Sequence, residues 1–118
     1  MGTLTIQIRS GTMMNMDTNV AVKLARAALD KGHGIKIFGY GEGVTLGKDG
    51  QDPKRFPNVG VELSELMSRG AEVIVCNTCT TARGIKRGEE IAGTVIGSIT
   101  NDLSRFVSES DRMVTLAR

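Results

Sequence analysis

Two cysteines, Cys76 and Cys79, are the residues of this 118-residue chain whose type and spacing most clearly allow chemistry. The β-branched segment 71–76 predicts a strand that ends at Cys76, and a short helix is expected from about Cys79 to Gly84. In open α/β sheets, ligands bind at the carboxyl edge of the strands, and helix N-termini favour anions. We therefore expect both thiols at a binding edge, where a thiol pKa can fall from about 8.5 towards neutrality.

The residues alone leave four interpretations of this pair open. Cys76 can be a small buried apolar residue, although packing alone does not explain a second thiol at Cys79. Zinc needs four ligands, and the single histidine, His33, is expected at the opposite end of a strand. A Cys-x-x-Cys pair suits disulfide exchange, but the Trp-Cys-Gly-Pro context of thioredoxins is absent. Nucleophilic acceptance of sulfur needs only an activated thiolate in a sheltered, positive pocket. Basic residues would add positive potential if they face the thiols: Arg83, Lys86 and Arg87.

Segments with the period of strands alternate with segments that have the spacing of helices. The expected strands are 3–9, 35–38, 71–76, 94–96 and 113–116. The expected helices lie between them, the first capped by Asp17 or Thr18 and the last capped within 100–102. Such alternation favours a parallel sheet with both faces covered. The sequence therefore predicts one domain, residues 1–118, with a three-layer α/β/α fold and a mainly parallel sheet of about five strands.

Residues 41–58 have no periodicity and contain both prolines of the chain. Because this segment follows the second expected strand, it should leave the same sheet edge as Cys76, and we expect it to form a mobile cover there. The stretch 39–43 looks like part of a nucleotide-binding glycine loop, but no helix follows promptly, which favours a turn. Three methionines after the first strand suit flexible packing, a subunit contact or a soft lining for bound sulfur: Met13, Met14 and Met16.

Composition excludes several classes of function. The formal net charge of +2 gives no reason to propose a nucleic-acid or membrane partner. No secretory signal and no apolar run of membrane-spanning length is visible, so the cytoplasm is the expected compartment. Cysteines there should be reduced thiols rather than a structural disulfide. No cofactor and no metal are expected.

The segment 73–85, Val-Ile-Val-Cys-Asn-Thr-Cys-Thr-Thr-Ala-Arg-Gly-Ile, resembles the active-site stretch of the DsrE/TusD sulfur-relay family. In that family a strand ends in a cysteine, which small residues and then Arg-Gly and an aliphatic residue follow. The similarity extends more loosely to the first strand, the Ala-rich helix ending at residues 27–33, and the closing segment 110–115. Counted back from Arg83-Gly84, the family cysteine corresponds to Cys76. The second cysteine, Cys79, departs from the best-known sulfur carriers.

The resemblance implies a sulfur carrier or sulfurtransferase subunit that accepts sulfane sulfur as a persulfide on Cys76 and relays it to an acceptor thiol. Cys79 would be the second reactive residue, with Asn77, Thr78 and Arg83 in support. The resemblance also implies sulfur-donor and sulfur-acceptor proteins as partners, and a homo-oligomer (trimer or hexamer) or a hetero-oligomer with sister chains. Two alternatives remain: a thiol–disulfide redox protein that uses both cysteines, and a non-catalytic oligomeric binding module of the same fold.

Overall fold

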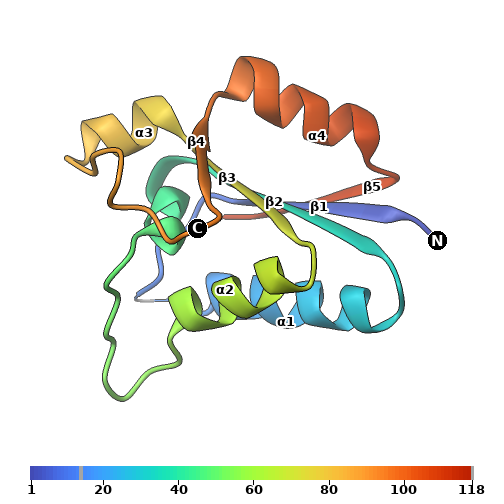
Figure 1. Cartoon of the computed structure of the whole chain (residues 1–118), viewed down its shortest axis with the longest axis horizontal. Helices are drawn as coiled ribbons and strands as arrows, with labels where there is room; N and C mark the ends of the chain where they lie inside the picture. The colour runs from blue at the N-terminus through green and yellow to red at the C-terminus, as the bar shows by residue number, and fades with distance from the viewer. Residues whose placement is uncertain (14, 118) are drawn as a thin grey trace.

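The computed structural model describes residues 1–13 and 15–117, and places five parallel strands in one sheet (Figure 1). The strands follow the order β4-β3-β2-β1-β5. Their bounds are Thr3–Ile8 for β1, Gly34–Gly39 for β2, Glu72–Cys76 for β3, Val95–Gly97 for β4 and Arg112–Leu116 for β5. The predicted α/β fold with a parallel sheet is confirmed. Parallel strands have a common carboxyl edge, so the segments that follow β1, β2 and β3 leave the sheet side by side.

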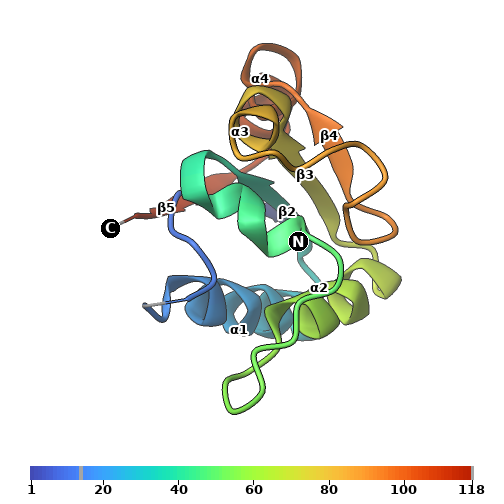
Figure 2. The same ribbon diagram turned by 90° about the vertical axis from the view of Figure 1, so that its left-hand side faces the viewer.

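Helices cover both faces of the sheet (Figures 1 and 2). Helices α1 (Asp17–Asp30) and α2 (Val59–Ser68) pack on one face, and α4 (Ser104–Glu109) lies over the other, together with the short α3 (Asn77–Ala82). The face under α3 and α4 carries a compact apolar group that we call the Cys76 cluster. Its buried members are Phe38, Val44, Ile74, Val75, Cys76, Ile96 and Phe106. Cys76 is thus part of the hydrophobic core.

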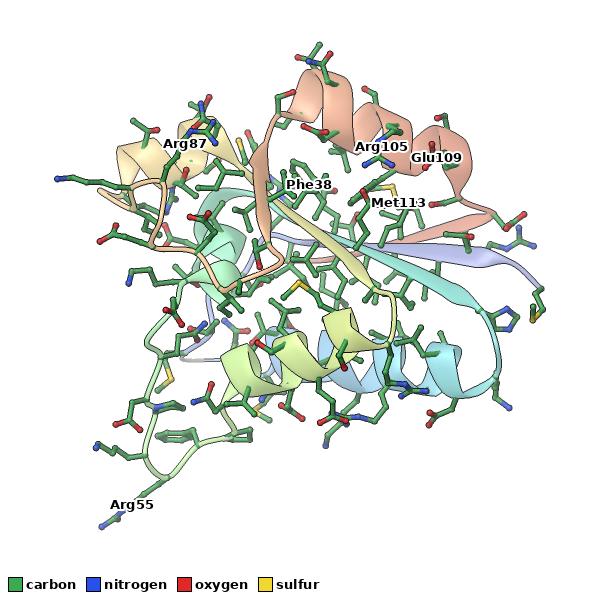
Figure 3. All side chains as sticks on the ribbon, viewed as in Figure 1. Phe38, Arg55, Arg87, Arg105, Glu109 and Met113 are labelled. Atoms are coloured by element: carbon green, nitrogen blue, oxygen red, sulfur yellow. The ribbon has the colours of Figure 1, made fainter. Side chains whose placement is uncertain are left out.

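Figure 3 shows Phe38 between the sheet and the helix above it. The rings of Phe38 and Phe106 meet edge to face, with centroids 6.3 Å apart. Phe106 also lies under two cations, the Lys36 ammonium at 5.2 Å and the Arg105 guanidinium at 5.0 Å from its centroid. Glu72 accepts hydrogen bonds from both cations. This network fixes α4 over the amino half of β2 and β3, away from the edge where Cys76 lies.

The expected helix starts need correction. Helix α3 begins at Asn77, directly after β3, so Cys76 is its N-cap and Cys79 falls in its first turn. Asp17 does not cap α1: it is the first helical residue, and its carboxylate accepts a hydrogen bond from the buried Ser10 hydroxyl at 2.6 Å. The backbone N–H of Asp17 instead donates to Asn15 Oδ1 at 2.9 Å.

The last helix also begins earlier than expected. A π-helical turn, η2 (Ile99–Leu103), precedes α4, and the Ser98 hydroxyl caps it by accepting from the Asn101 N–H at 3.1 Å. The Asp102 carboxylate in turn accepts from the Ser98 N–H at 2.7 Å. Ser98, not a residue within 100–102, is therefore the cap.

Residues 41–58 are not one open loop. Their first part is a 3-10 helix, η1 (Gly41–Gly47), which buries Val44 and Leu46. Gly43 permits this packing, because a Cβ built on it would lie 2.0 Å from the Ile8 carbonyl oxygen. The remainder extends away from the sheet, with Arg55 at its tip (Figure 3). Only η1 therefore approaches the Cys76 edge.

Candidate functional site

The two thiols lie together at the carboxyl edge of β3. Cys76 is 3% exposed within the Cys76 cluster, while Cys79 is half-buried and packs against the same cluster from α3. Both cysteines are free, and the neighbouring Cys76 raises the pKa of the Cys79 thiol. The strand-to-helix turn brings the two residues together, because the N-cap residue and the residue three positions later lie at the same end of the helix. The prediction that both thiols lie at this edge is confirmed.

A backbone N–H from the neighbouring connection contacts the outer thiol. Strand β2 is paired with β3, so η1, which follows β2, reaches α3. The Gly41 N–H donates to Cys79 Sγ at 3.2 Å. Gly41 has φ of +62°, a conformation that glycine adopts without strain, and this conformation starts η1. The backbone thus holds the sulfur of Cys79 in a fixed position.

Burial raises the pKa of the Cys79 thiol. The Gly41 N–H lowers that pKa, because it stabilises the thiolate, whereas the hydrogen bond with Cys76 raises it further. Arg83 also lowers it, with the smallest effect. The expectation that the helix N-terminus depresses a thiol pKa is therefore wrong for Cys79, which is a protonated thiol at neutral pH. Helix α3 has only six residues, too few for a strong dipole to offset burial.

The positive charge of Arg83 does not act on the thiols as a free charge, because the guanidinium is paired. Its Nε donates to the Glu42 carboxylate at 2.8 Å, its Nη2 donates to the same oxygen, and its Nη1 donates to the Cys79 carbonyl at 3.0 Å. The Glu42 carboxylate raises the already high pKa of Arg83. The ion pair neutralises the guanidinium and joins α3 to η1, so Arg83 positions the segment that carries Cys79.

The other expected supporting residues lie at the rim. Asn77 and Thr78 are exposed in the first turn of α3. Lys86 and Arg87 are exposed as well, and they line a hollow of about 340 Å³ together with Asn77 and Thr81. Neither cysteine lines this hollow, which Arg87 borders beside α3 in Figure 3. Its basic rim is therefore separate from the thiols.

Apolar and aromatic groups enclose the remaining sides of Cys76. Tyr40, Ile85 and Leu103 are partly buried against the Cys76 cluster. The Arg9 guanidinium lies 5.7 Å from the centroid of the Tyr40 ring, which places a cation at the outer side of that ring. The surroundings of Cys76 are consequently sheltered and mainly apolar.

Sequence reasoning missed Gly41, Glu42 and Tyr40, all on the segment that follows β2. The order of the strands was the missing information, since it decides that β2 lies directly beside β3. Once this adjacency is known, the carboxyl-edge rule places residues 40–42 next to α3.

Two further expectations concern methionines and metals. Met13 and Met16 line a hollow of about 350 Å³ with Phe56 and Pro57, which neither cysteine enters, so they do not line the thiol site. Met14 is outside the described residues. Within residues 1–13 and 15–117, no group of three His, Cys, Asp or Glu side chains is arranged to hold a metal ion. His33 lies before β2, at the opposite end of that strand from the site, and its Nδ1 accepts from the Gly2 N–H at 3.1 Å.

No helix in the described part of the chain is long and apolar enough to cross a membrane.

Among relatives, protein MK0008 of Methanopyrus kandleri is 38% identical over 94 residues, which cover 80% of this chain and 77% of that protein. The provisionally named sulfurtransferase DsrE of Allochromatium vinosum is 33% identical over 85 residues, 68% of this chain and 64% of that protein.

The crystal structure of the YchN protein from Escherichia coli has the same fold. It superposes with a TM-score of 0.90 at 25% identity, covering 98% of this chain and all of that one. A family model matches residues 3–116, nearly the whole chain and all five strands. The chain therefore belongs to the DsrE/DsrF-like family.

Proposed function

We propose that this protein is a sulfur carrier or sulfurtransferase subunit that holds sulfane sulfur as a persulfide on Cys76. The observation that carries the proposal is the pair of free thiols at the carboxyl edge of β3, one ending the strand and one in the first turn of α3. Family membership and the relative named as a sulfurtransferase support sulfur relay as the general role.

In the loading step, the Cys76 thiolate attacks the outer sulfur of a donor persulfide. The new S–S bond forms at Cys76, the S–S bond of the donor breaks, and the donor leaves as a thiolate. Cys79, which stays protonated, can donate its S–H to the Cys76 sulfur. Delivery is the same exchange in the other direction: an acceptor thiolate attacks the outer sulfur and releases Cys76.

The apolar surroundings of Cys76 suit the storage of a reactive sulfur. Phe38, Ile96 and Phe106 exclude water, and with it soluble thiols that would remove the sulfur at random. The low exposure of Cys76 also restricts the donor. Loading requires either a slender donor, such as a low-molecular-weight persulfide, or a displacement of η1 by a donor protein.

Donor and acceptor proteins are the partners that this role requires. We place the reaction in the cytoplasm, where two free cysteines stay reduced. A closed assembly, either a trimer or hexamer of this chain or a hetero-oligomer with sister chains, is part of the same proposal. Light scattering coupled to size exclusion should detect it, and a monomer at micromolar concentration would contradict it.

The test is intact-mass analysis after anaerobic incubation with glutathione persulfide. The Cys79→Ser variant should gain the mass of one sulfur atom, which reductant removes, while Cys76→Ser should gain none. Thr81→Ser is a matched control, because Thr81 is an exposed residue of the same helix. If Cys76→Ser gains sulfur and Cys79→Ser does not, the sulfur is held on Cys79 and its assignment to Cys76 is wrong.

The placement of two free cysteines at the N-cap and third residue of α3 favours a second candidate, a thiol–disulfide redox protein. Such a protein would exchange with a disulfide substrate and need no sulfane sulfur. Oxidised glutathione distinguishes the two: rapid formation of the Cys76–Cys79 disulfide with this reagent, without loading by glutathione persulfide, would support the redox candidate.

A further inference from the structure

We infer that Cys79 discharges the sulfur held on Cys76, releasing it as hydrosulfide and leaving a Cys76–Cys79 disulfide. This inference rests on the proposed function, because it starts from the Cys76 persulfide. It adds a second activity at the same site: reduction of sulfane sulfur by the dithiol of the protein. Each sulfur atom held on Cys76 is then either transferred to an acceptor thiol or released as hydrosulfide.

Position makes Cys79 an attacking group for Cys76. The two residues are the N-cap and the third residue of α3, and Cys79 packs against the cluster that contains Cys76. The Cα atoms of residues so placed fall within the range of about 4.4–6.8 Å that a disulfide tolerates. A disulfide can therefore form by rotation of the Cys79 side chain, without displacement of β3 or α3.

The step balances without any external oxidant. The Cys79 thiolate attacks the inner sulfur, Cys76 Sγ, and the bond between Cys76 Sγ and the outer sulfur breaks. The outer sulfur leaves with the electron pair as hydrosulfide, so the sulfane sulfur is reduced while the two thiols are oxidised to a disulfide. An external dithiol is the class of reductant that returns the chain to its reduced form.

Burial explains why the inner sulfur is the target. Cys76 is buried in the cluster against which Cys79 packs, whereas the added outer sulfur must occupy space beyond Cys76 Sγ. Burial also raises the pKa of the Cys79 thiol, which keeps most of it protonated at neutral pH. Only a small fraction of Cys79 is therefore the attacking thiolate at neutral pH, which slows discharge.

The Gly41 N–H restrains Cys79 and so limits how readily it attacks Cys76. It donates to Cys79 Sγ at 3.2 Å and holds this sulfur towards η1. Rotation of Cys79 onto Cys76 breaks that hydrogen bond, so a partner that displaces η1 would free Cys79 to attack.

The experiment measures hydrosulfide with monobromobimane during anaerobic incubation with glutathione persulfide, followed by intact-mass analysis. The wild type should release about one hydrosulfide per chain and end with two hydrogens fewer, the mass of the disulfide. Cys79→Ser and Cys79→Ala should keep the added sulfur and release none above the donor blank. Thr81→Ser should match the wild type.

One result overturns the inference while the proposed function stands: a wild-type persulfide as long-lived as that of Cys79→Ser. If neither Cys79 variant loads although both give the wild-type circular dichroism spectrum, the persulfide itself does not form and the proposed function fails with the inference.

Discussion

Gly43 is the residue whose substitution most directly tests how η1 is held over the site. Its own φ is outside the left-handed region, so alanine meets no backbone strain there. The added methyl group, however, would lie 2.0 Å from the Ile8 carbonyl oxygen and 2.6 Å from the carbon of that carbonyl. Ordinary carbon–oxygen contacts are about 3.3–3.6 Å, so η1 and β1 must separate by about 1 Å. β1 lies inside the sheet between β2 and β5, so η1 is the part that moves.

The expected cost of Gly43→Ala follows from this geometry. Overpacking of a well-packed site costs about 1–3 kcal/mol, and the obstacle here is backbone rather than a flexible side chain, so we expect about 3 kcal/mol. For a chain of this length, that loss lowers the midpoint of thermal unfolding by about 10–15 °C. The shift also moves the Gly41 N–H away from Cys79 Sγ. Because that hydrogen bond lowers the pKa of Cys79, its loss should raise this pKa further.

Two measurements check the prediction. Thermal unfolding followed by circular dichroism gives the loss of stability, and the pH dependence of iodoacetamide alkylation in a Cys76→Ser background gives the change at Cys79. Gly11→Ala is the matched control, because its Cβ would meet no atom closer than 3.7 Å and its φ is also outside the left-handed region. If Gly43→Ala and Gly11→Ala unfold at the same temperature, η1 is not packed against β1 as described.

Two further predictions concern charged groups. Glu42→Gln leaves Arg83 without its carboxylate partner. Since Arg83 already lowers the pKa of Cys79, the pH midpoint of alkylation should fall; an unchanged or higher midpoint would contradict this. Glu72, whose pKa is lowered chiefly by its hydrogen bond from Arg105, contributes stability above the unfolded-state pKa of about 4.3 and loses it as the pH falls through the lowered folded value. Urea unfolding should therefore show that Glu72→Gln lowers the free energy of unfolding by under about 1 kcal/mol at pH 7, since Glu72 is partly exposed. This loss should shrink below about pH 4. A loss that does not depend on pH would contradict the prediction.

The fold was predictable because local signals and the global architecture agree. Alternation in β1 and the β-branched run in β3 mark strands, and Gly32 and Gly70 end α1 and α2 in the left-handed conformation that favours glycine. Helix starts were less predictable: Asp17 and Thr18 are both good caps by type, yet both lie inside α1, whose N-cap is Met16. The Asp17 carboxylate instead accepts from Ser10, seven residues away, a partner that local sequence does not indicate.

The candidate site was predictable only as far as one segment of chain supplies it. Cys76 and Cys79 lie within four residues, so the strand-to-helix turn alone brings them together. The environment of Cys79 comes from η1, and it reaches α3 because β2 pairs with β3, a pairing that periodicity does not encode. For the same reason the charge of Arg83 could not be assigned from its position after the motif, since its partner Glu42 is 41 residues away. Strand adjacency therefore determines the chemistry of this dithiol: the same Cys-x-x-Cys without η1 would have a more exposed Cys79, a free arginine and a lower thiol pKa.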